Sequence, residues 1–346
     1  MYFFDVSMAD VVITVKMTNT LSLLFNYCIF TTDLYFVFKY VRSFIAYHGI
    51  YDEIDKHFEM KYNQEIRSQV KCSVVVSLLL WFLFSAIDFA AWFIFYDLIN
   101  VVAYSICYLA FLMRLLTVFE LSCHSILICN RLRTILDVLD DHFSLTDDVP
   151  SCIKVESSPK VGVRSISVAV LVKSKKTRDT LVAKLSSYYL LLMKQASFLN
   201  KYFGARILLY CVYTLSEIIS FVNTMDRLLT VSKRGQGKFS KYFYYPLAAI
   251  FLRLLSCVTL LVFLVYHCEL TSRQCECIID AIDDLLVNKK ISVEEHAFLE
   301  ELRSLVSTRP IRFHAANFFN LNYTLILSIA SVVVTYAILI IQTNPR

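Results

Sequence analysis

Charged residues are scarce in this sequence. They make up 18% of its 346 residues, while 57% are hydrophobic and the mean hydropathy is +0.58. A soluble domain is typically about 45–50% apolar and about 25% charged. The composition therefore argues against an ordinary soluble protein and predicts an all-α, polytopic membrane protein.

Glycine and the common catalytic motifs are scarce as well. The chain has five glycines, five prolines and seven dispersed histidines, and it has no glycine-rich phosphate loop, no GxSxG and no HExxH. Secondary transporters use repeats and helices broken by glycine or proline, so this class is disfavoured. We expect binding and gating rather than covalent chemistry, with no enzyme activity and no cofactor.

A metal site and a nucleic-acid interface are also disfavoured. Several of the eleven cysteines lie inside apolar runs, where cysteine behaves as a small hydrophobe. Cys268, Cys275 and Cys277, close to His267, have spacings that match no zinc pattern, and their role stays open. The net charge of +5 is spread over the loops rather than gathered on one face. We expect no metal and no nucleic-acid partner.

Six apolar stretches are long enough to cross a bilayer as helices, which takes about 20 residues. They cover residues 19–40, 72–95, 101–128, 204–225, 244–266 and 318–342. The ends of the polar segment at about 130–200 are expected to continue the helices beside it. Residues 1–266 are then a ligand-binding membrane region, 267–317 a cytoplasmic helical pair, and 318–346 the last span with a short tail.

Lysine and arginine are distributed unevenly between the two sides of these spans. The loops at 41–71, 129–203 and 267–317 carry about three times as many of them as the remaining loops and the chain ends. The more basic side is the cytoplasmic one in membrane proteins. The C-terminus, and the N-terminus as given, are therefore expected outside the cell.

The helical pair at 267–310 has a clear internal start signal. Ser292 with Glu295 three residues later resembles a capping box. An apolar stripe follows on an otherwise charged helix, formed by Phe298, Leu299, Leu302, Leu305 and Val306. Such a stripe needs a partner, and we expect it to be the same helix of another subunit.

The last span carries its polar residues on one side. No Lys, Arg, Asp or Glu occurs from Phe313 to Pro345. At 100° per residue, five polar side chains fall within about 60° of one another: Thr324, Ser328, Ser331, Thr335 and Gln342. The stripe serves packing between helices, because Ser and Thr permit close approach, or it lines a water-filled pore. Spacing alone favours packing.

Charged side chains within the spans are candidates for a binding site. Each costs about 2.5–3.5 kcal/mol at a helix centre and must face protein or water; they are Asp88, Arg114, Glu120, Arg206, Glu217 and Arg253. Aromatic walls with a few polar groups suit a small molecule. The candidate ligand-binding residues are Asp88, Trp92, Tyr96, Tyr104, Tyr108, Arg114, Tyr213, Glu217 and Arg253, with Tyr244 and Tyr245 at the same level. Alternatively, the four charges among these candidates form two interhelical salt bridges and the aromatic residues form an interface belt.

The most specific motif lies at the C-terminus. Thr335-Tyr336, five apolar residues and Gln342 resemble the TYhhhhhQ signature (h, hydrophobic) of insect gustatory receptors. Residues 309–322, RPIRFHAANFFNLN, are similar to the segment that precedes the last helix in that family. The remainder of the chain matches only by helix count and loop lengths. The family pattern usually continues Gln-Phe, whereas Thr343 follows here.

The resemblance implies a seven-helix, tastant-gated cation channel in the plasma membrane, with a cytoplasmic N-terminus and an external C-terminus. It also implies a homo- or hetero-tetramer with other gustatory receptor subunits, embedded in membrane lipid. The last helix of each subunit would line the pore with Thr324, Ser328, Ser331, Thr335 and Gln342, and Ile338 and Leu339 would close it by dewetting. Tyr336 would pack against neighbouring helices. The expected ligand is a bitter or other plant-derived compound.

Two further expectations concern signalling and completeness. The alternative function is a metabotropic seven-helix receptor that acts through a G protein, but this class has the opposite topology, which the charge bias disfavours. Alignment from the C-terminus makes the family's first helix the missing one, so we expect the chain to come from an incomplete gene model.

Overall fold

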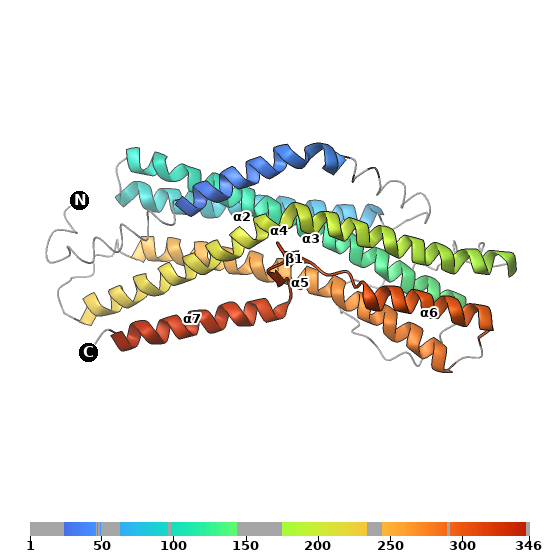
Figure 1. Ribbon diagram of the computed structural model, residues 1–346. Helices are drawn as coiled ribbons and strands as arrows, with labels where there is room; N and C mark the ends of the chain where they lie inside the picture. Colours follow the sequence, from blue (N-terminus) through green and yellow to red (C-terminus); the bar gives the residue numbers. More distant parts are fainter. Residues whose placement is uncertain are drawn as a thin grey trace. The chain divides into compact units, whose positions relative to one another are not determined.

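The computed structural model describes residues 24–45, 47, 49, 63–95, 98–143, 175–233, 244–288 and 291–343. Helices dominate these residues (Figure 1), which confirms the predicted all-α class. An unlabelled helix spans residues 24–45, and the others are α2 (Asn63–Phe95), α3 (Leu98–Phe143), α4 (Lys175–Lys233), α5 (Tyr244–Asn288), α6 (Val293–Thr308) and α7 (Tyr323–Thr343). Two-residue strands, β1 (His314–Ala315) and β2 (Phe319–Asn320), pair before α7.

Several helices are apolar enough to lie in a membrane. Within the described residues, three stretches have the length and composition to cross one: Cys107–Asp140, Lys184–Asn223 and Phe251–Val287. Val74–Ile87 and Tyr323–Leu339 are shorter apolar stretches. All five overlap spans predicted from the sequence. Helix α2 exposes large apolar side chains such as Leu79 and Phe82, as a lipid-facing helix does.

The long polar segment behaves at its ends as predicted. Helix α3 continues to Phe143, and α4 already begins at Lys175, so both extend well beyond the predicted spans. Residues 144–174, the predicted middle of this segment, lie outside the described part of the chain.

The chain divides into two compact units. Unit 1 contains residues up to Leu121 together with Lys201–Val265 and Ala315–Arg346, and unit 2 contains Ser122–Asn200 and Tyr266–His314. Helices α3, α4 and α5 therefore contribute residues to both. The regions expected from the sequence, 1–266, 267–317 and 318–346, are each contiguous, whereas each unit combines segments that are distant in the chain.

The core of unit 1 joins helix 24–45, α3, α4 and α5. Ile29, Tyr213 and Cys257 are at most 2% exposed and form a cluster that is completed by Phe25, Phe111 and Leu209. The hydroxyl of Tyr210 donates a hydrogen bond to the carbonyl oxygen of Cys257 at 2.6 Å. This side-chain hydrogen bond links α4 to α5, whereas the backbone hydrogen bonds of a helix stay within that helix.

Unit 2 is joined by polar contacts across its helices as well as by apolar packing. The hydroxyls of Ser125 on α3 and Thr271 on α5 lie 2.8 Å apart, and both side chains are fully buried. The side-chain amide of Asn200 on α4 donates to the carbonyl of Arg312 at 2.8 Å and accepts from the backbone N–H of His314 at 3.0 Å. Asn200 thus binds this extended segment as a neighbouring β-strand would.

Helix α6 begins as the sequence predicts. The Ser292 hydroxyl accepts a hydrogen bond from the Glu295 N–H, and the Glu295 carboxylate accepts one from the Ser292 N–H, so the capping box is confirmed.

The partner predicted for the α6 stripe is wrong. Leu299, Leu302 and Val306 are all 0% exposed within the single chain. Arg303 also forms an ion pair with Asp283 of α5. Phe298 and Leu305 are half-buried, so the apolar stripe is largely covered inside unit 2 and needs no second subunit, because the chain folds α6 back onto its own helices.

The predicted start of the last span is also wrong. Residues 318–322 form a turn and β2, and α7 begins only at Tyr323. The reason is a tight turn at Ala316 and Asn317, whose φ angles of 49° and 63° lie in the left-handed region and prevent a helix there. The 21 residues of α7 still span about 30 Å, close to the thickness of a bilayer core.

Candidate functional site

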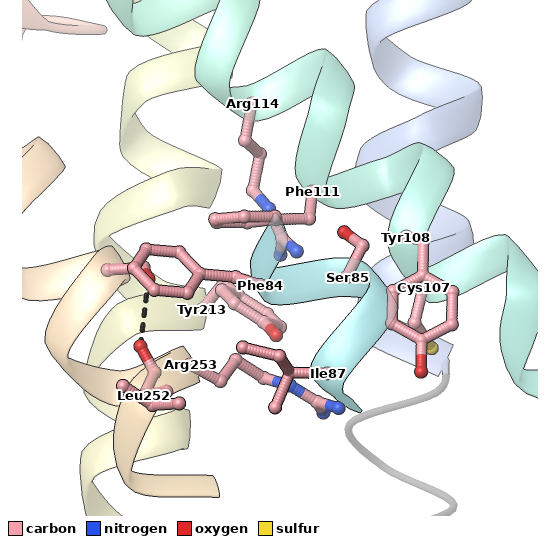
Figure 2. A pocket seen from close by; sticks show the side chains of 11 residues that line it. Phe84, Ser85, Ile87, Cys107, Tyr108, Phe111, Arg114, Tyr213, Leu252 and Arg253 are labelled. Carbon is pink, nitrogen blue, oxygen red and sulfur yellow. Dashed lines mark hydrogen bonds between the residues drawn. The ribbon is translucent and has the colours of Figure 1, made fainter. Parts of the chain in front are cut away.

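A small cavity lies between four helices of unit 1 (Figure 2). Its volume is about 30 Å³, enough for a few water molecules. Helix α2 contributes Phe84, Ser85 and Ile87, α3 contributes Cys107, Tyr108, Phe111 and Arg114, α4 contributes Tyr213, and α5 contributes Leu252, Arg253 and Ser256. The lining combines aromatic walls with two guanidinium groups, so it can receive a small ligand that has both a polar and an apolar part.

Arg114 is the most unusual member of this lining. Arg114 is 3% exposed. Its guanidinium carbon lies 3.7 Å from the ring centre of Tyr213 and 5.8 Å from that of Phe111. The position over Tyr213 is favourable for a cation, because the ring face is electron-rich. Among the described residues, Nε and Nη1 have no hydrogen-bond partner. The positive charge is thus held by aromatic faces while two nitrogen atoms of the guanidinium stay unpartnered.

The structure brings together four of the nine predicted ligand-binding residues. Tyr108, Arg114, Tyr213 and Arg253 line the cavity. Glu217 lies one helical turn beyond Tyr213 on α4, is 8% exposed and interacts electrostatically with Arg114. The remaining candidates cannot be placed in the site. Tyr96 lies outside the described residues, and the structure describes only the backbone of Asp88, Trp92 and Tyr104.

The other neutral residues of the lining are not among the candidates predicted from the sequence. Phe84, Ser85, Phe111 and Ser256 were not predicted because none of them is costly in a membrane. A signal was present, since each lies three or four positions from a predicted charged residue on its helix, and such positions share a face.

A buried ion pair occupies another part of unit 1. Arg206 Nε on α4 lies 2.6 Å from Asp33 Oδ1 on helix 24–45, and both side chains are 3% exposed. A second nitrogen of Arg206 contacts the Thr117 hydroxyl on α3. Arg206 was one of the costly charges seen in the sequence, and its partner is 173 positions away. The charge of Arg206 therefore faces protein, as expected of a charged side chain within a span.

The polar stripe of α7 is exposed in the single chain. This applies to Thr324, Ser328, Ser331, Thr335 and Gln342, and to the predicted gate residues Ile338 and Leu339. Ser328 and Thr335 donate their hydroxyls to the carbonyls of Thr324 and Ser331, at 2.8 and 2.9 Å. Two hydroxyls of the stripe are thus satisfied by their own helix, and the surface they form is open for water or for a neighbouring chain.

Tyr336, the second residue of the C-terminal motif, points away from this stripe. It is half-buried, and its hydroxyl donates a hydrogen bond to Asn223 Oδ1 on α4 at 2.9 Å. This contact attaches α7 to α4 within unit 1.

Removing that contact should have a modest effect. We expect Tyr336→Phe to lower the free energy of unfolding by about 0.5–1.5 kcal/mol, because one hydrogen bond is lost and the ring remains. The measurement is the thermal unfolding of the purified chain in detergent, with Tyr27→Phe, at an exposed tyrosine, as the control. Asn223→Ala should add little to Tyr336→Phe; additive losses would show that the two residues act separately.

Comparison with known proteins supplies the family. The model of the 7tm chemosensory receptor family matches residues 2–344, nearly the whole chain. No curated protein sequence matches. The solved structure of the insect olfactory receptor OR5 from Machilis hrabei in complex with eugenol is similar, with a TM-score of 0.55 and 11% identity over 94% of this chain and 80% of that one.

The structural similarity and the family match describe different properties, the fold and the sequence relationship. At 11% identity, the likeness to the olfactory receptor shows the fold alone, and it confirms the predicted insect chemoreceptor fold. The family model adds the sequence relationship that the C-terminal motif had indicated. The chain belongs to the 7tm chemosensory receptor family.

Proposed function

We propose that this chain is a gustatory receptor subunit that forms a tastant-gated, non-selective cation channel in the plasma membrane. Its ligand is a bitter or other plant-derived small molecule, and its C-terminus is extracellular. Four subunits, identical or mixed with other gustatory receptors, surround one pore. Binding opens the pore because the ligand has a higher affinity for the open arrangement.

The observation that carries this proposal is the exposure of the motif helix. In α7 the polar stripe that ends at Gln342 is uncovered, while Tyr336, which lies off the stripe, attaches the helix to α4. A helix with one polar stripe in an apolar protein needs water or other subunits against that stripe. A central pore formed by four copies supplies both, and Ile338 and Leu339, beside the stripe, then form its hydrophobic gate.

The cavity supports the ligand part of the proposal. It lies among helices other than α7 and combines aromatic and cationic side chains, which suits a small organic molecule. The similar olfactory receptor was solved with eugenol, a small molecule. Because the cavity has room for only a few water molecules, a tastant must shift the side chains around it.

The test is a recording of whole-cell currents during application of plant compounds, eugenol among them. We expect a ligand-evoked cation current that persists when G proteins are blocked. In Gln342→Ala we expect altered ion permeation, because the amide at the pore mouth is lost. Val334→Ala is the matched control, since Val334 is 58% exposed on α7 and is not one of the polar residues of the stripe.

Two outcomes would contradict the proposal. A current abolished by the G-protein block would favour the metabotropic alternative. A current with the same permeation in wild type and Gln342→Ala would place the stripe in helix packing instead of the pore.

A further inference from the structure

The cavity described above is lined by an arginine whose hydrogen-bond donors are only partly used. Arg114 carries five N–H donors and no acceptor, and a guanidinium keeps its charge in a protein. At 3% exposure, its Nε and Nη1 find no acceptor among the described residues. A buried polar atom without a partner costs about 1–3 kcal/mol, and more when it is charged. An acceptor on a bound molecule would remove this cost.

A second cation faces the same space. Arg253 reaches the cavity from α5, whereas Arg114 reaches it from α3 (Figure 2). Glu217 and Asp33 interact electrostatically with Arg114, but neither lines the cavity, and Asp33 is itself paired with Arg206. Among the described residues that line the cavity there are thus two guanidinium groups and no carboxylate, in surroundings of low polarity where charges act strongly.

The rest of the lining is mostly apolar. Phe84, Phe111, Ile87 and Leu252 supply apolar walls. The hydroxyl of Ser256 donates to the carbonyl of Leu252 at 2.8 Å within its own helix. The cavity therefore offers N–H donors from two arginines and ring faces around them, while its acceptors are neutral hydroxyl groups rather than carboxylates.

We propose that the cavity binds a small carboxylate with an aromatic or short apolar body. The carboxylate accepts hydrogen bonds from Arg114 and is attracted by Arg253, and the body packs against the aromatic walls. This inference rests on the proposed function, since it names the chemical class of the tastant. A neutral analogue of the same shape would leave the Arg114 donors poorly paired and would bind more weakly.

The experiment measures binding without using the channel current. Thermal unfolding of the purified full chain in detergent at neutral pH is followed with benzoate, methyl benzoate and benzamide. We expect benzoate to raise the midpoint of unfolding in a concentration-dependent manner, and the two neutral analogues to bind about tenfold or more weakly. This comparison needs no variant, so it stands even if an altered protein does not fold.

Variants locate the effect at the cavity. We expect Arg114→Gln to remove most of the benzoate-induced shift and Arg114→Lys to keep part of it, because the lysine retains the charge. Arg273→Gln is the matched control, at an arginine that is exposed on α5 in unit 2 and should leave the shift unchanged. Equal shifts with benzoate and methyl benzoate, or an undiminished benzoate shift in Arg114→Gln, would overturn the proposal.

The experiments distinguish failure of the channel proposal from failure of the carboxylate-site proposal. A benzoate shift that depends on Arg114, in a protein that carries no current, supports the carboxylate site and counts against the channel. A current opened by neutral compounds alone, without any benzoate shift, supports the channel and overturns the carboxylate site.

Discussion

Replacement of Arg206 by methionine is expected to lower the free energy of unfolding by roughly 3–5 kcal/mol. The guanidinium Nε lies 2.6 Å from Asp33 Oδ1, and both side chains are 3% exposed. Without Arg206, the Asp33 carboxylate stays buried with its charge uncompensated, and the Thr117 hydroxyl also loses a partner. We expect reduced thermal stability in detergent and less protein at the cell surface.

The double variant Asp33→Leu, Arg206→Met isolates the cause. It contains neither charge, so it should recover most of the lost stability, as buried ion pairs replaced by apolar residues often do. Arg273→Met is the control, because Arg273 pairs with Glu269 at an exposed position and such pairs contribute at most about 1 kcal/mol. A single Arg206→Met variant as stable as the wild type would show that this ion pair contributes nothing.

Truncation of the α6 stripe has the second large expected effect. Leu302→Ala should lower the free energy of unfolding by about 2–5 kcal/mol, because it removes a fully buried side chain and leaves a cavity. The loss should be the same at low protein concentration, where an assembly of subunits would dissociate, since the stripe is covered by the chain's own helices. Thermal unfolding over a range of protein concentrations measures this.

The control lies on the same helix. Val293 is 88% exposed at the start of α6, so Val293→Ala should change stability by less than about 0.5 kcal/mol. If Leu302→Ala were harmless in separated subunits and harmful only in the assembled protein, the stripe would be a subunit interface, as the sequence alone had led us to expect.

Features that depend on neighbouring residues could be predicted well. The Ser292–Glu295 capping box forms because its two residues meet within one turn of helix. The long apolar runs predicted helices correctly for a similar reason, because the backbone hydrogen bonds of a helix join residues only four positions apart. Candidate site residues could also be identified in part, because a charge such as Arg114 or Arg253 is costly in a membrane wherever it lies.

Contacts between distant residues could not be predicted. The pairing of Arg206 with Asp33 and of Tyr336 with Asn223 depends on which helix faces come together. The late start of α7 depends on left-handed backbone angles at Ala316 and Asn317, and alanine gives no sequence signal for such a turn. The uncharged cavity residues, Phe111 among them, likewise carry no cost that would distinguish them from other apolar positions.

The sequence by itself determined the class of protein, the helices and the C-terminal motif, because composition, periodicity and short motifs act within one helix or one turn. Only the tertiary structure decided that α6 is covered within its own chain, that Arg206 is neutralised by Asp33, and that Arg114 stands among aromatic rings with unpartnered nitrogen atoms. The physical reason is that burial and charge pairing depend on two helices in contact, so their energies cannot be inferred from the sequence of either helix alone.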